Sequence, residues 1–421
     1  MGCKNTQSEK MNKKYANFFE HLRLVSVYQT KILIKTKICN IKLKQEMKRI
    51  FTLLLSSISL IATAQERCGT EIHTKNMMDN NDSYAIARKK VNAQTEKWIE
   101  NHPNHSEKTI ITIPVIVHVV WKTITHNISD AQIQSQIDVL NEDYRRTNAD
   151  KINTPNIWQT IAADSEIEFC LAATDPNGNP SIGIERTQTT HGQFGMDSDI
   201  HTSSAGGADD WPNDDYLNIW VCNIQSGLLG YASPPSNWVG DGDGLVIGYQ
   251  YFGRTGAAQS PYHKGRTATH EIGHWLNLDH VWGDDWGPNI GCNGDDDVAD
   301  TPNQEEENYN CPSFPHNANA CSTNNGDMFM NYMDYTNDAC MNLFTNGQKT
   351  RMLAAINNYR SNMLSHSLCE GSIGISEQTN NNRKLVKIVD VLGRTSSEKQ
   401  TNTPLFYIYD NGSVEKKMII E

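Results

Sequence analysis

The chain has 421 residues, enough for more than one domain and a large buried core, and its 38% hydrophobic content excludes a disordered protein. The formal net charge of −12 is uneven, because residues 1–49 carry +9, from 12 Lys and Arg against 3 Asp and Glu, and the remainder carries −21. An acidic body argues against a nucleic-acid partner and is compatible with cationic substrates and calcium.

A secretory signal peptide is predicted at residues 47–64. The positive pair Lys48-Arg49 precedes an apolar run too short to span a bilayer, and Ala62-Thr63-Ala64 matches a cleavage pattern. The alternative is a signal anchor, which needs a longer apolar run. Because a signal peptide belongs at the N-terminus, we expect translation to start at Met47 and residues 1–46 to be an upstream over-call. Export would make the protein secreted and disulfides permissible.

The middle of the chain mixes strand patterns with amphipathic helices. A polar segment at 65–108 contains one predicted helix, 83–101, whose pattern is amphipathic. The strands predicted from apolar and β-branched runs are 109–121, 166–174, 216–224 and 244–253. The further predicted helices are 129–146, 269–276 and 347–364. Strands mixed with long helices predict an α/β or α+β layered domain.

The composition changes after Cys369. A polar linker is followed by two strand patterns, 385–393 and 404–421, and Asp410-Asn411-Gly412 supplies a hairpin turn. We therefore expect residues 370–421 to be a linker and a small β module, too small to be a catalytic domain.

The motif HEIGHWLNLDH indicates a metal site. On a helix, His270 and His274 share one face, and Glu271 can reach a metal-bound water without being a ligand. The third ligand, His280, requires the chain to leave the helix near Asn277 through a left-handed residue. Glycine does this at no steric cost and Asn is the next most tolerant residue.

Three neutral histidines leave the charge of the ion uncompensated and so bring the pKa of its water toward about 7. One alternative is a helix whose histidines lie on the surface and bind no metal. A second alternative is a catalytically silent, zinc-containing surface-binding protein, but a structural zinc site needs a fourth ligand and no general base. A third is a metal-dependent amidase acting on small molecules. The motif favours a zinc-dependent hydrolase.

The same motif, together with NYMDYTNDACMNLF at 331–344, resembles the metzincin clan of zinc peptidases and, within it, the pappalysin family and its ulilysin/cytophagalysin branch. The similarity runs from Thr109 to Leu364. It implies a secreted zinc endopeptidase with a catalytic domain at 109–369. The implied metzincin fold has a twisted, mainly parallel sheet with two long helices over an irregular lower subdomain.

The resemblance also implies roles for single residues. The three histidines become zinc ligands and Glu271 becomes the general base and acid. Met333 becomes the Met-turn residue beneath the metal, although a plain core methionine is the alternative. Tyr335 would stabilise the tetrahedral intermediate, unless it is only an aromatic in the cleft wall. Asp338 would form the floor of the S1′ pocket and favour Arg or Lys after the scissile bond, with a solvated loop aspartate as the alternative.

Four of the ten cysteines cluster in the loop-rich region after the histidines, and the sequence alone leaves three pairings open. The resemblance implies two disulfides, Cys292–Cys321 and Cys311–Cys340. No partner is assigned to Cys170, Cys222 and Cys369.

Calcium is a second expected ion. In CNGDDDVADTP, Asp296 and Thr301 match calcium-site positions of the family, and Asp300 is a plausible neighbour. Oxygen-rich loops suit calcium, whereas an acidic solubilising loop is the alternative.

The sequence RCGT, which begins at Arg67, resembles the cysteine-switch element of zymogens in this group. A Cys68 thiolate is a strong zinc ligand and would displace the catalytic water. Residues 65–108 would then be a pro-segment removed by proteolysis. The alternative is an unpaired or disulfide-bonded cysteine.

The C-terminal module resembles the sorting domain read by type IX secretion machinery, which implies release from the cell or attachment to its surface. An ordinary accessory β module is the alternative. The expected partners are protein or peptide substrates, and the expected state is a monomer. A substrate is expected to lie extended along an edge strand near 244–253 by strand addition.

Overall fold

The computed structural model describes residues 67–102, 110–196, 198–236, 242–283, 291–321, 326–370, 384–396, 404–410 and 414–417, with Lys35, Lys37, Lys42, Lys44 and Lys48. The chain divides into two units, 1–65 and 66–421. In the first unit the described lysines are helical and exposed. The predicted signal peptide lies outside the described residues except for Lys48, as do the linker 371–383 and the hairpin residues Asn411 and Gly412. No helix in the described part is long and apolar enough to cross a membrane.

The second unit is organised around a six-stranded sheet. Its strands are β1 (Ile111–Trp121), β2 (Ile167–Leu171), β3 (Ile184–Gln188), β4 (Leu217–Cys222), β5 (Gly230–Ala232) and β6 (Gly244–Gly248). The order is β2-β1-β4-β6-β5, and β3 pairs with the second half of β1. Every pair is parallel except β5 with β6. The predicted class of a mainly parallel sheet is therefore confirmed.

The expected edge strand at 244–253 is wrong. β6 lies between β4 and β5, and the chain leaves it at Gly248 to form a short 3-10 turn. The edge is β5, a three-residue strand that runs antiparallel to β6.

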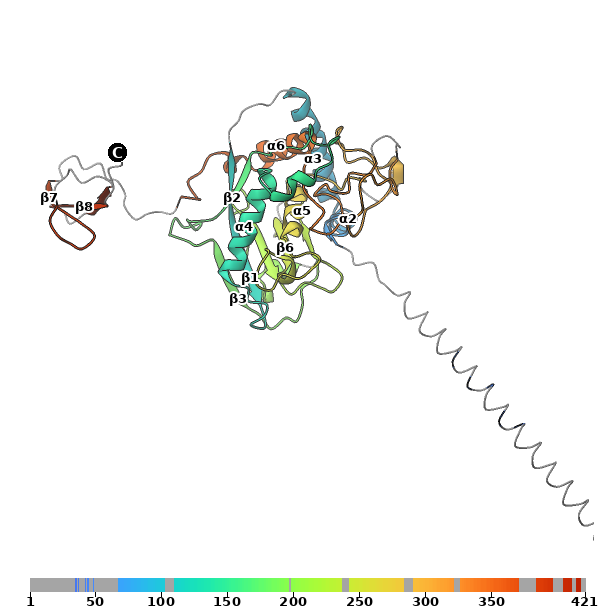
Figure 1. Ribbon diagram of the computed structural model, residues 1–421, viewed down its shortest axis with the longest axis horizontal. Helices are drawn as coiled ribbons and strands as arrows, with labels where there is room; N and C mark the ends of the chain where they lie inside the picture. The colour runs from blue at the N-terminus through green and yellow to red at the C-terminus, as the bar shows by residue number, and fades with distance from the viewer. Residues whose placement is uncertain are drawn as a thin grey trace, which may run out of the picture. The chain divides into compact units, whose positions relative to one another are not determined.

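Two helices cover one face of the sheet (Figure 1). They are α4 (Asp130–Tyr144) and α5 (Arg266–Trp275). The Ser129 side chain caps α4 by accepting a hydrogen bond from the Gln132 backbone. Alternate residues of the central strands, such as Val117, share one core with Ile137 of α4 and Ile272 of α5. This packing fixes α5 firmly against the sheet.

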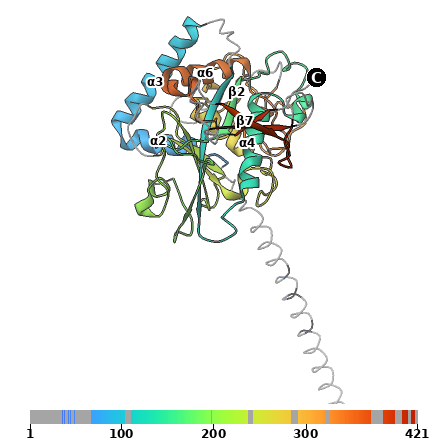
Figure 2. The ribbon, with the colours of Figure 1, turned by 90° about the vertical axis from the view of Figure 1, so that its left-hand side faces the viewer.

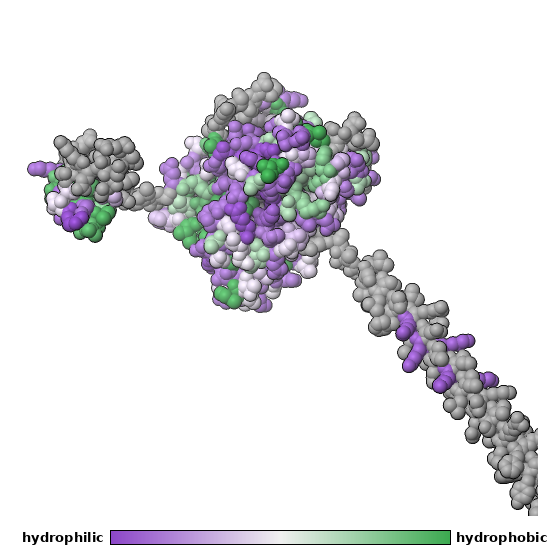
Figure 3. All heavy atoms as spheres, in the orientation of Figure 1, coloured by the Kyte–Doolittle hydropathy of each residue, from purple (hydrophilic) through white to green (hydrophobic). Residues whose placement is uncertain are grey.

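A third helix, α6 (Asn346–Tyr359), begins with a capping box between Thr345 and Gln348. The region between α5 and α6 contains, among its described residues, only one 3-10 turn, Gly291–Asn293. The described part of the chain contains three disulfides: Cys292–Cys321, Cys311–Cys340 and Cys170–Cys369. The first two are the pairs that the resemblance implies, and they hold this irregular region together. Polar residues cover most of the face shown in Figure 3.

The described N-terminal segment, 67–102, forms two helices, α2 (Thr70–Asn80) and α3 (Asp82–Asn101). α3 matches the predicted helix and packs against α6, and α2 packs against β5 (Figure 2). The sequence did not predict α2, which buries only Thr70 and Thr74 and so carries no apolar stripe.

The C-terminal module contains a three-stranded antiparallel sheet of order β7-β8-β9. Its strands are β7 (Leu385–Val389), β8 (Leu405–Tyr409) and β9 (Val414–Lys417). Ile388, Leu405 and Tyr407 form a small core of its own. The predicted β module is therefore confirmed as a sheet.

Candidate metal centre

Helix α5 carries two of the three histidines of the motif. His270 and His274 are one turn apart, so both rings project from one face. The helix ends at Trp275, and Asn277 follows with a φ of +67°, the left-handed conformation expected at this position. The resulting turn brings His280 back beside the first two rings.

The three Nε2 atoms converge. The His274 Nε2 lies 3.2 Å from the His270 Nε2 and 3.1 Å from the His280 Nε2. Nitrogens that each bind one zinc ion at about 2.0–2.1 Å in tetrahedral geometry stand about 3.3 Å apart. The spacing of the three rings therefore fits a single zinc ion.

Hydrogen bonds set the tautomers of two rings. The His270 Nδ1 lies 2.7 Å from the Tyr332 carbonyl oxygen, and the His274 Nδ1 lies 2.8 Å from the Leu278 carbonyl oxygen. A carbonyl only accepts, so each Nδ1 donates and each Nε2 keeps a free lone pair. Burial lowers the pKa of His274 and of His280 to about 3 and that of His270 well below its ordinary value. Neutral imidazole is the form that binds metal.

Cys68 supplies a fourth donor from the N-terminal segment. Its side chain is fully buried and forms no disulfide. Its Sγ and one nitrogen from each of the three histidines all lie within 4.8 Å of one another. Burial, and then the Glu271 carboxylate, raise the pKa of the Cys68 thiol well above its usual range. Three imidazoles and one sulfur are a donor set typical of tetrahedral zinc, so these residues fit the ion.

Glu271 is fully buried beside this cluster. Its Oε2 accepts hydrogen bonds from the Thr70 hydroxyl, at 2.7 Å, and from the Cys68 Sγ, at 3.3 Å. Its Oε1 has no hydrogen-bond partner among the described residues. Burial raises the pKa of the Glu271 carboxyl to about 7, against a smaller opposing effect of the two hydrogen bonds. The group is therefore poised to exchange a proton near neutral pH.

Met333 and Tyr335 lie on either side of the cluster. The fully buried Met333 packs so closely on α5 that a Cβ on Gly273 would stand 2.4 Å from the Met333 Sδ. The Tyr335 ring packs edge-on against His280, with centroids 5.0 Å apart, and its hydroxyl lies 3.5 Å from the Cys68 carbonyl oxygen. Met333 therefore supports the ligand helix, and Tyr335 faces the space that Cys68 occupies.

Asp338 forms the floor of a buried cation site. Its Oδ2 accepts hydrogen bonds from the backbone amides of Lys264, at 2.8 Å, and of Arg266, at 3.3 Å. Its Oδ1 lies 3.4 Å from the Arg67 Nη2, and both side chains are buried. The Arg67 Nη1 also donates to the Thr336 carbonyl oxygen, and its guanidinium stands 5.2 Å from the centre of the Tyr262 ring. The sequence placed Arg67 only inside a motif and gave it no role.

The N-terminal segment extends the sheet at β5. Cys68 forms a parallel bridge with Gly230, with hydrogen bonds from Gly69 N to Gly230 O and from Leu229 N to Arg67 O. The Thr70 hydroxyl accepts a hydrogen bond from the Ala232 amide, at 2.8 Å, while it donates to Glu271. The segment therefore occupies the strand-addition position at the metal centre.

A buried carboxylate behind the ligands was not predicted. The Asp143 side chain accepts hydrogen bonds from the Tyr332 hydroxyl, at 2.8 Å, and the Thr269 hydroxyl, at 2.9 Å, and it pairs with Arg266. Thr269 precedes His270, and the Tyr332 carbonyl accepts a hydrogen bond from the His270 Nδ1. No local motif marks Asp143, because its partners are brought to it by the packing of α4 against α5.

The expected calcium residues are only partly brought together. The Thr301 hydroxyl lies 2.8 Å from the Asp296 Oδ1 and 2.7 Å from the Val298 carbonyl oxygen. The Asp300 Oδ2 instead accepts a hydrogen bond from the Gly347 amide at the start of α6. Burial raises the pKa of Asp296 well above its usual range.

Comparisons with known proteins agree with this site. The family model described as pregnancy-associated plasma protein-A matches residues 201–357. An extracellular metalloprotease of Arthroderma otae is 31% identical over 255 residues, which cover 59% of this chain and 79% of that protein. One from Arthroderma benhamiae is 32% identical over 247 residues, which cover 58% of this chain and 76% of that protein.

Two solved structures are more similar still. Mature mirolysin of Tannerella forsythia, in complex with a cleaved peptide, is 53% identical, with a TM-score of 0.57, over 61% of this chain and 96% of that one. A promirolysin mutant from the same organism is 48% identical, with a TM-score of 0.61, over 71% of this chain and 97% of that one. These relatives argue against the catalytically silent and the amidase alternatives. The chain therefore belongs to the pregnancy-associated plasma protein-A family of metzincin metallopeptidases, and it is a zinc metalloendopeptidase.

Proposed function

We propose that the protein is a secreted, monomeric zymogen that cleaves peptide bonds before Arg or Lys once a pro-segment, 65–108, is removed from the catalytic domain, 109–369. The observation that carries the proposal is the buried pair of Arg67 and Asp338 beside the metal centre. Several relatives are named extracellular metalloproteases, which supports export. The signal peptide at 47–64 would provide it.

The Asp338 site is built for a cation. Two backbone amides satisfy the Oδ2 of its carboxylate, and the other oxygen faces the Arg67 guanidinium. Removal of Arg67 with the pro-segment leaves a buried carboxylate that a substrate Arg or Lys would pair. The Thr336 carbonyl and the Tyr262 ring add a hydrogen bond and a cation–π contact for the incoming side chain.

The direction of the substrate follows from this site. The pro-segment runs parallel to β5, and the residue before Cys68 lies in the Asp338 site. A substrate that places the residue after its scissile bond in the same site runs the opposite way, antiparallel to β5. The pro-segment therefore fills the cleft without presenting a peptide bond in the orientation that is cut.

The zinc ion, when bound, supplies Lewis-acid chemistry that polarises the scissile carbonyl and lowers the pKa of water toward about 7. Glu271 takes a proton from the attacking water at its carboxylate and passes it to the leaving amine as the C–N bond breaks. The Tyr335 hydroxyl donates a hydrogen bond to the carbonyl oxygen as negative charge develops there. His270, His274 and His280 would hold the ion, and Met333 supports the helix that carries the first two.

Latency would use three contacts of the pro-segment. The Cys68 sulfur lies beside the three histidine nitrogens and would take the fourth position of a bound zinc ion in place of water. The Thr70 hydroxyl engages Glu271, and Arg67 fills the specificity site. The water position at the metal, the general base Glu271 and the substrate pocket at Asp338 would thus be blocked together.

The test is cleavage of a mixed peptide library by protein freed of residues 65–108, compared with its Glu271→Ala variant, with product ends read by mass spectrometry. We expect cuts before Arg or Lys that need zinc and are absent in the variant. Cuts before other residues would keep the peptidase and contradict the Asp338 assignment.

The C-terminal sheet of β7, β8 and β9 would serve as the type IX sorting signal, since it folds around a core of its own. Removal of residues 370–421 should leave peptide cleavage unchanged and keep the protein inside the producing cell. Normal export of the shortened protein would contradict this role.

Asp296 and Thr301, with the Val298 carbonyl, would hold a structural calcium ion. Calcium should then raise the unfolding temperature of the protein but not that of an Asp296→Asn variant. An equal rise in both proteins would contradict the assignment.

A further inference from the structure

The pro-segment touches the catalytic domain at a second place, on α3, well along the chain from Cys68. Arg88 is buried between α3 and the catalytic domain, and its Nη1 donates to the Asn277 Oδ1, at 2.8 Å, and to the Pro235 carbonyl oxygen, at 2.6 Å. Hydrogen bonds from a guanidinium to two buried oxygens are charge-assisted and costly to remove.

The Asn277 side chain is directed wholly to α3. Besides accepting from Arg88, its Nδ2 lies 3.4 Å from the Asn92 Oδ1 and 3.3 Å from the Thr95 Oγ1. No hydrogen bond of this side chain to the described residues of the catalytic domain is present. The Asn277 backbone, in contrast, is held by that domain, since its carbonyl accepts from the Arg351 Nε at 2.7 Å.

This division explains why an asparagine occupies a position where glycine would be least strained. The φ of +67° needs only a residue that tolerates the left-handed region, and glycine does so without steric conflict. The backbone turn therefore does not require the amide group. The amide group instead makes hydrogen bonds to three side chains of α3, which glycine could not make.

α6 completes the surface. The Tyr359 hydroxyl lies 2.8 Å from the Gln94 Oε1 and 3.3 Å from the Val91 carbonyl oxygen, and the Asn358 Nδ2 lies 3.5 Å from the Gln94 carbonyl oxygen. Val91 itself is fully buried against the catalytic domain.

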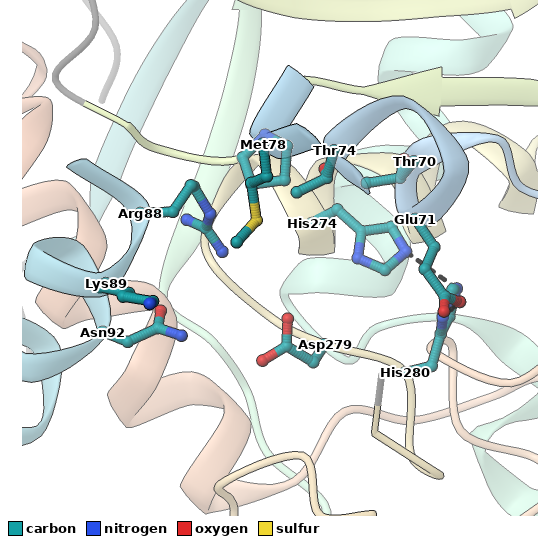
Figure 4. Close-up of a pocket in the computed structure, with 11 residues that line it drawn as sticks. Thr70, Glu71, Thr74, Met78, Arg88, Lys89, Asn92, His274, Asp279 and His280 are labelled. Carbon is teal, nitrogen blue, oxygen red and sulfur yellow. Dashed lines mark hydrogen bonds and ion pairs between the residues drawn. The ribbon is translucent and has the colours of Figure 1, made fainter. Parts of the chain in front are cut away.

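A cavity of about 380 Å³ separates this contact from the metal centre. Thr70 and Thr74 line it from α2, Arg88 lines it from α3, and His274 and His280 line it from the catalytic domain (Figure 4). The contacts made by Thr70 and by Arg88 therefore lie at different points of the wall of one cavity.

We propose that the surface formed by Pro235, Asn277, Asn358 and Tyr359, here named the Asn277 surface, is a second docking site that retains the pro-segment when the Cys68 thiol has been displaced. The proposal rests on the zymogen function proposed above. It makes activation a two-step event, in which loss of the thiol–metal contact frees a position at the metal and cleavage of the segment is still needed to clear the cleft.

The test follows retention of a nicked pro-segment. The full-length, zinc-loaded chain would carry Glu271→Ala, to prevent self-cleavage, and a recognition site for a specific protease within 103–109. After cutting, dissociation of the segment is followed by size-exclusion chromatography and mass spectrometry. The readout does not depend on catalysis, so it remains valid if the proposed peptidase specificity is wrong, and the library experiment tests that specificity separately.

Three variants are compared in a Cys68→Ala background. The parent should keep its nicked segment. Arg88→Met should release it about tenfold faster, because one charged hydrogen bond is worth about one tenfold step in an equilibrium constant. Lys90→Met is the matched control, since Lys90 is an exposed cation on the same helix, and it should release the segment at the parent rate.

Asn277→Gly supplies a second, reciprocal variant that keeps the left-handed turn. It should speed release as Arg88→Met does, and the effect of the two changes together should be smaller than the sum of the single effects, because both remove the Arg88–Asn277 hydrogen bond. Immediate release from the Cys68→Ala parent, or equal rates for Arg88→Met and Lys90→Met, would overturn the proposal.

Discussion

The Arg67 guanidinium lies 3.4 Å from the Asp338 carboxylate, and both side chains are buried. A buried carboxylate of this kind is stable only when a cation pairs with it or when donors satisfy it. Two backbone amides satisfy one Asp338 oxygen, and Arg67 pairs with the other.

Replacing Asp338 by Asn should therefore reduce kcat/KM for peptides with Arg after the scissile bond by about 30- to 150-fold. The loss of one charge from a buried, hydrogen-bonded pair is worth about 2–3 kcal/mol. Paired peptides that differ only in carrying Arg or citrulline at that position provide the measurement. The citrulline peptide serves as the control, and an equal loss on both peptides would show that Asp338 acts on structure and not on charge.

The Tyr335 hydroxyl lies 3.5 Å from the Cys68 carbonyl oxygen at the metal centre, so under the proposed mechanism Tyr335→Phe should act mainly on kcat. Removing one hydrogen-bond donor to a developing oxyanion lowers kcat by about 100-fold or more, with KM nearly unchanged. Steady-state kinetics of the activated enzyme measure both constants. Tyr309→Phe, whose ring lies 6.1 Å from that of Tyr335, is the comparison and should leave kcat close to wild type. A change confined to KM would contradict the assignment.

Sequence patterns predicted the elements whose signal is local. α3 and α4 carry asparagine or serine caps and buried stripes, and both begin within a residue or two of the predicted positions. The spacing of His270, His274 and His280 predicted a shared site because a helical turn and a left-handed residue define that geometry without the rest of the fold.

The features that the sequence does not predict depend on packing between segments that are far apart in the chain. β5 has only three residues, too few to show alternation, so the sequence predicts the edge at the longer β6. Asp143 reaches Tyr332 across 189 positions, and Cys170 pairs with Cys369 across 199. Such partners are set by the sheet order and by helix packing, not by any nearby pattern.

The three histidines make the metal-free latent protein sensitive to acid. Burial lowers the pKa of His274 and His280 to about 3 and that of His270 well below its ordinary value. The unfolded chain binds protons at these groups below about pH 6.5, and the folded chain does not, so the free energy of unfolding falls as pH falls from 6.5. Between pH 7 and pH 5, His274 and His280 should each remove about 2 kcal/mol, and His270 acts in the same direction.

Glu271 has the opposite effect on how the free energy of unfolding changes with pH. Its pKa is raised to about 7, so between about pH 4.5 and pH 7 the folded state holds a proton that the unfolded chain lacks, and acidification stabilises the fold there. Glu271 offsets about one histidine, so the free energy of unfolding should still fall by at least about 2 kcal/mol between pH 7 and pH 5. Urea unfolding at pH 7 and pH 5 with a chelator present measures it. His274→Gln should reduce the difference by about 2 kcal/mol, and an unchanged difference would contradict this account.

Stabilisation by the disulfide Cys170–Cys369 should be separable from catalysis. The bond joins β2, at the edge of the sheet opposite β5, to the end of the catalytic domain, and it closes a loop of 199 residues. Replacing both cysteines by serine should lower the free energy of unfolding by about 2–5 kcal/mol because the unfolded chain gains conformational freedom. Denaturant titration measures that loss, and kcat/KM at 25 °C should stay close to wild type. A large fall in kcat/KM would show that the two edges are coupled.

The buried Asp143 should control how firmly the zinc ion is held, because it fixes the residue before His270 and the loop that orients the His270 ring. Asp143→Asn should release zinc to a chelator about 10- to 100-fold faster, the usual effect of losing a partner that orients a ligand. Asp150→Asn is the matched control, since Asp150 also pairs with Arg266, and no hydrogen bond joins it to Tyr332 or Thr269 among the described residues. If both variants release zinc equally fast, the shared pairing with Arg266 would account for the effect. Faster zinc release from Asp143→Asn alone, with a similar fall in the free energy of unfolding of both variants, would show that the contacts from Asp143 through Tyr332 to His270 position the metal ligand.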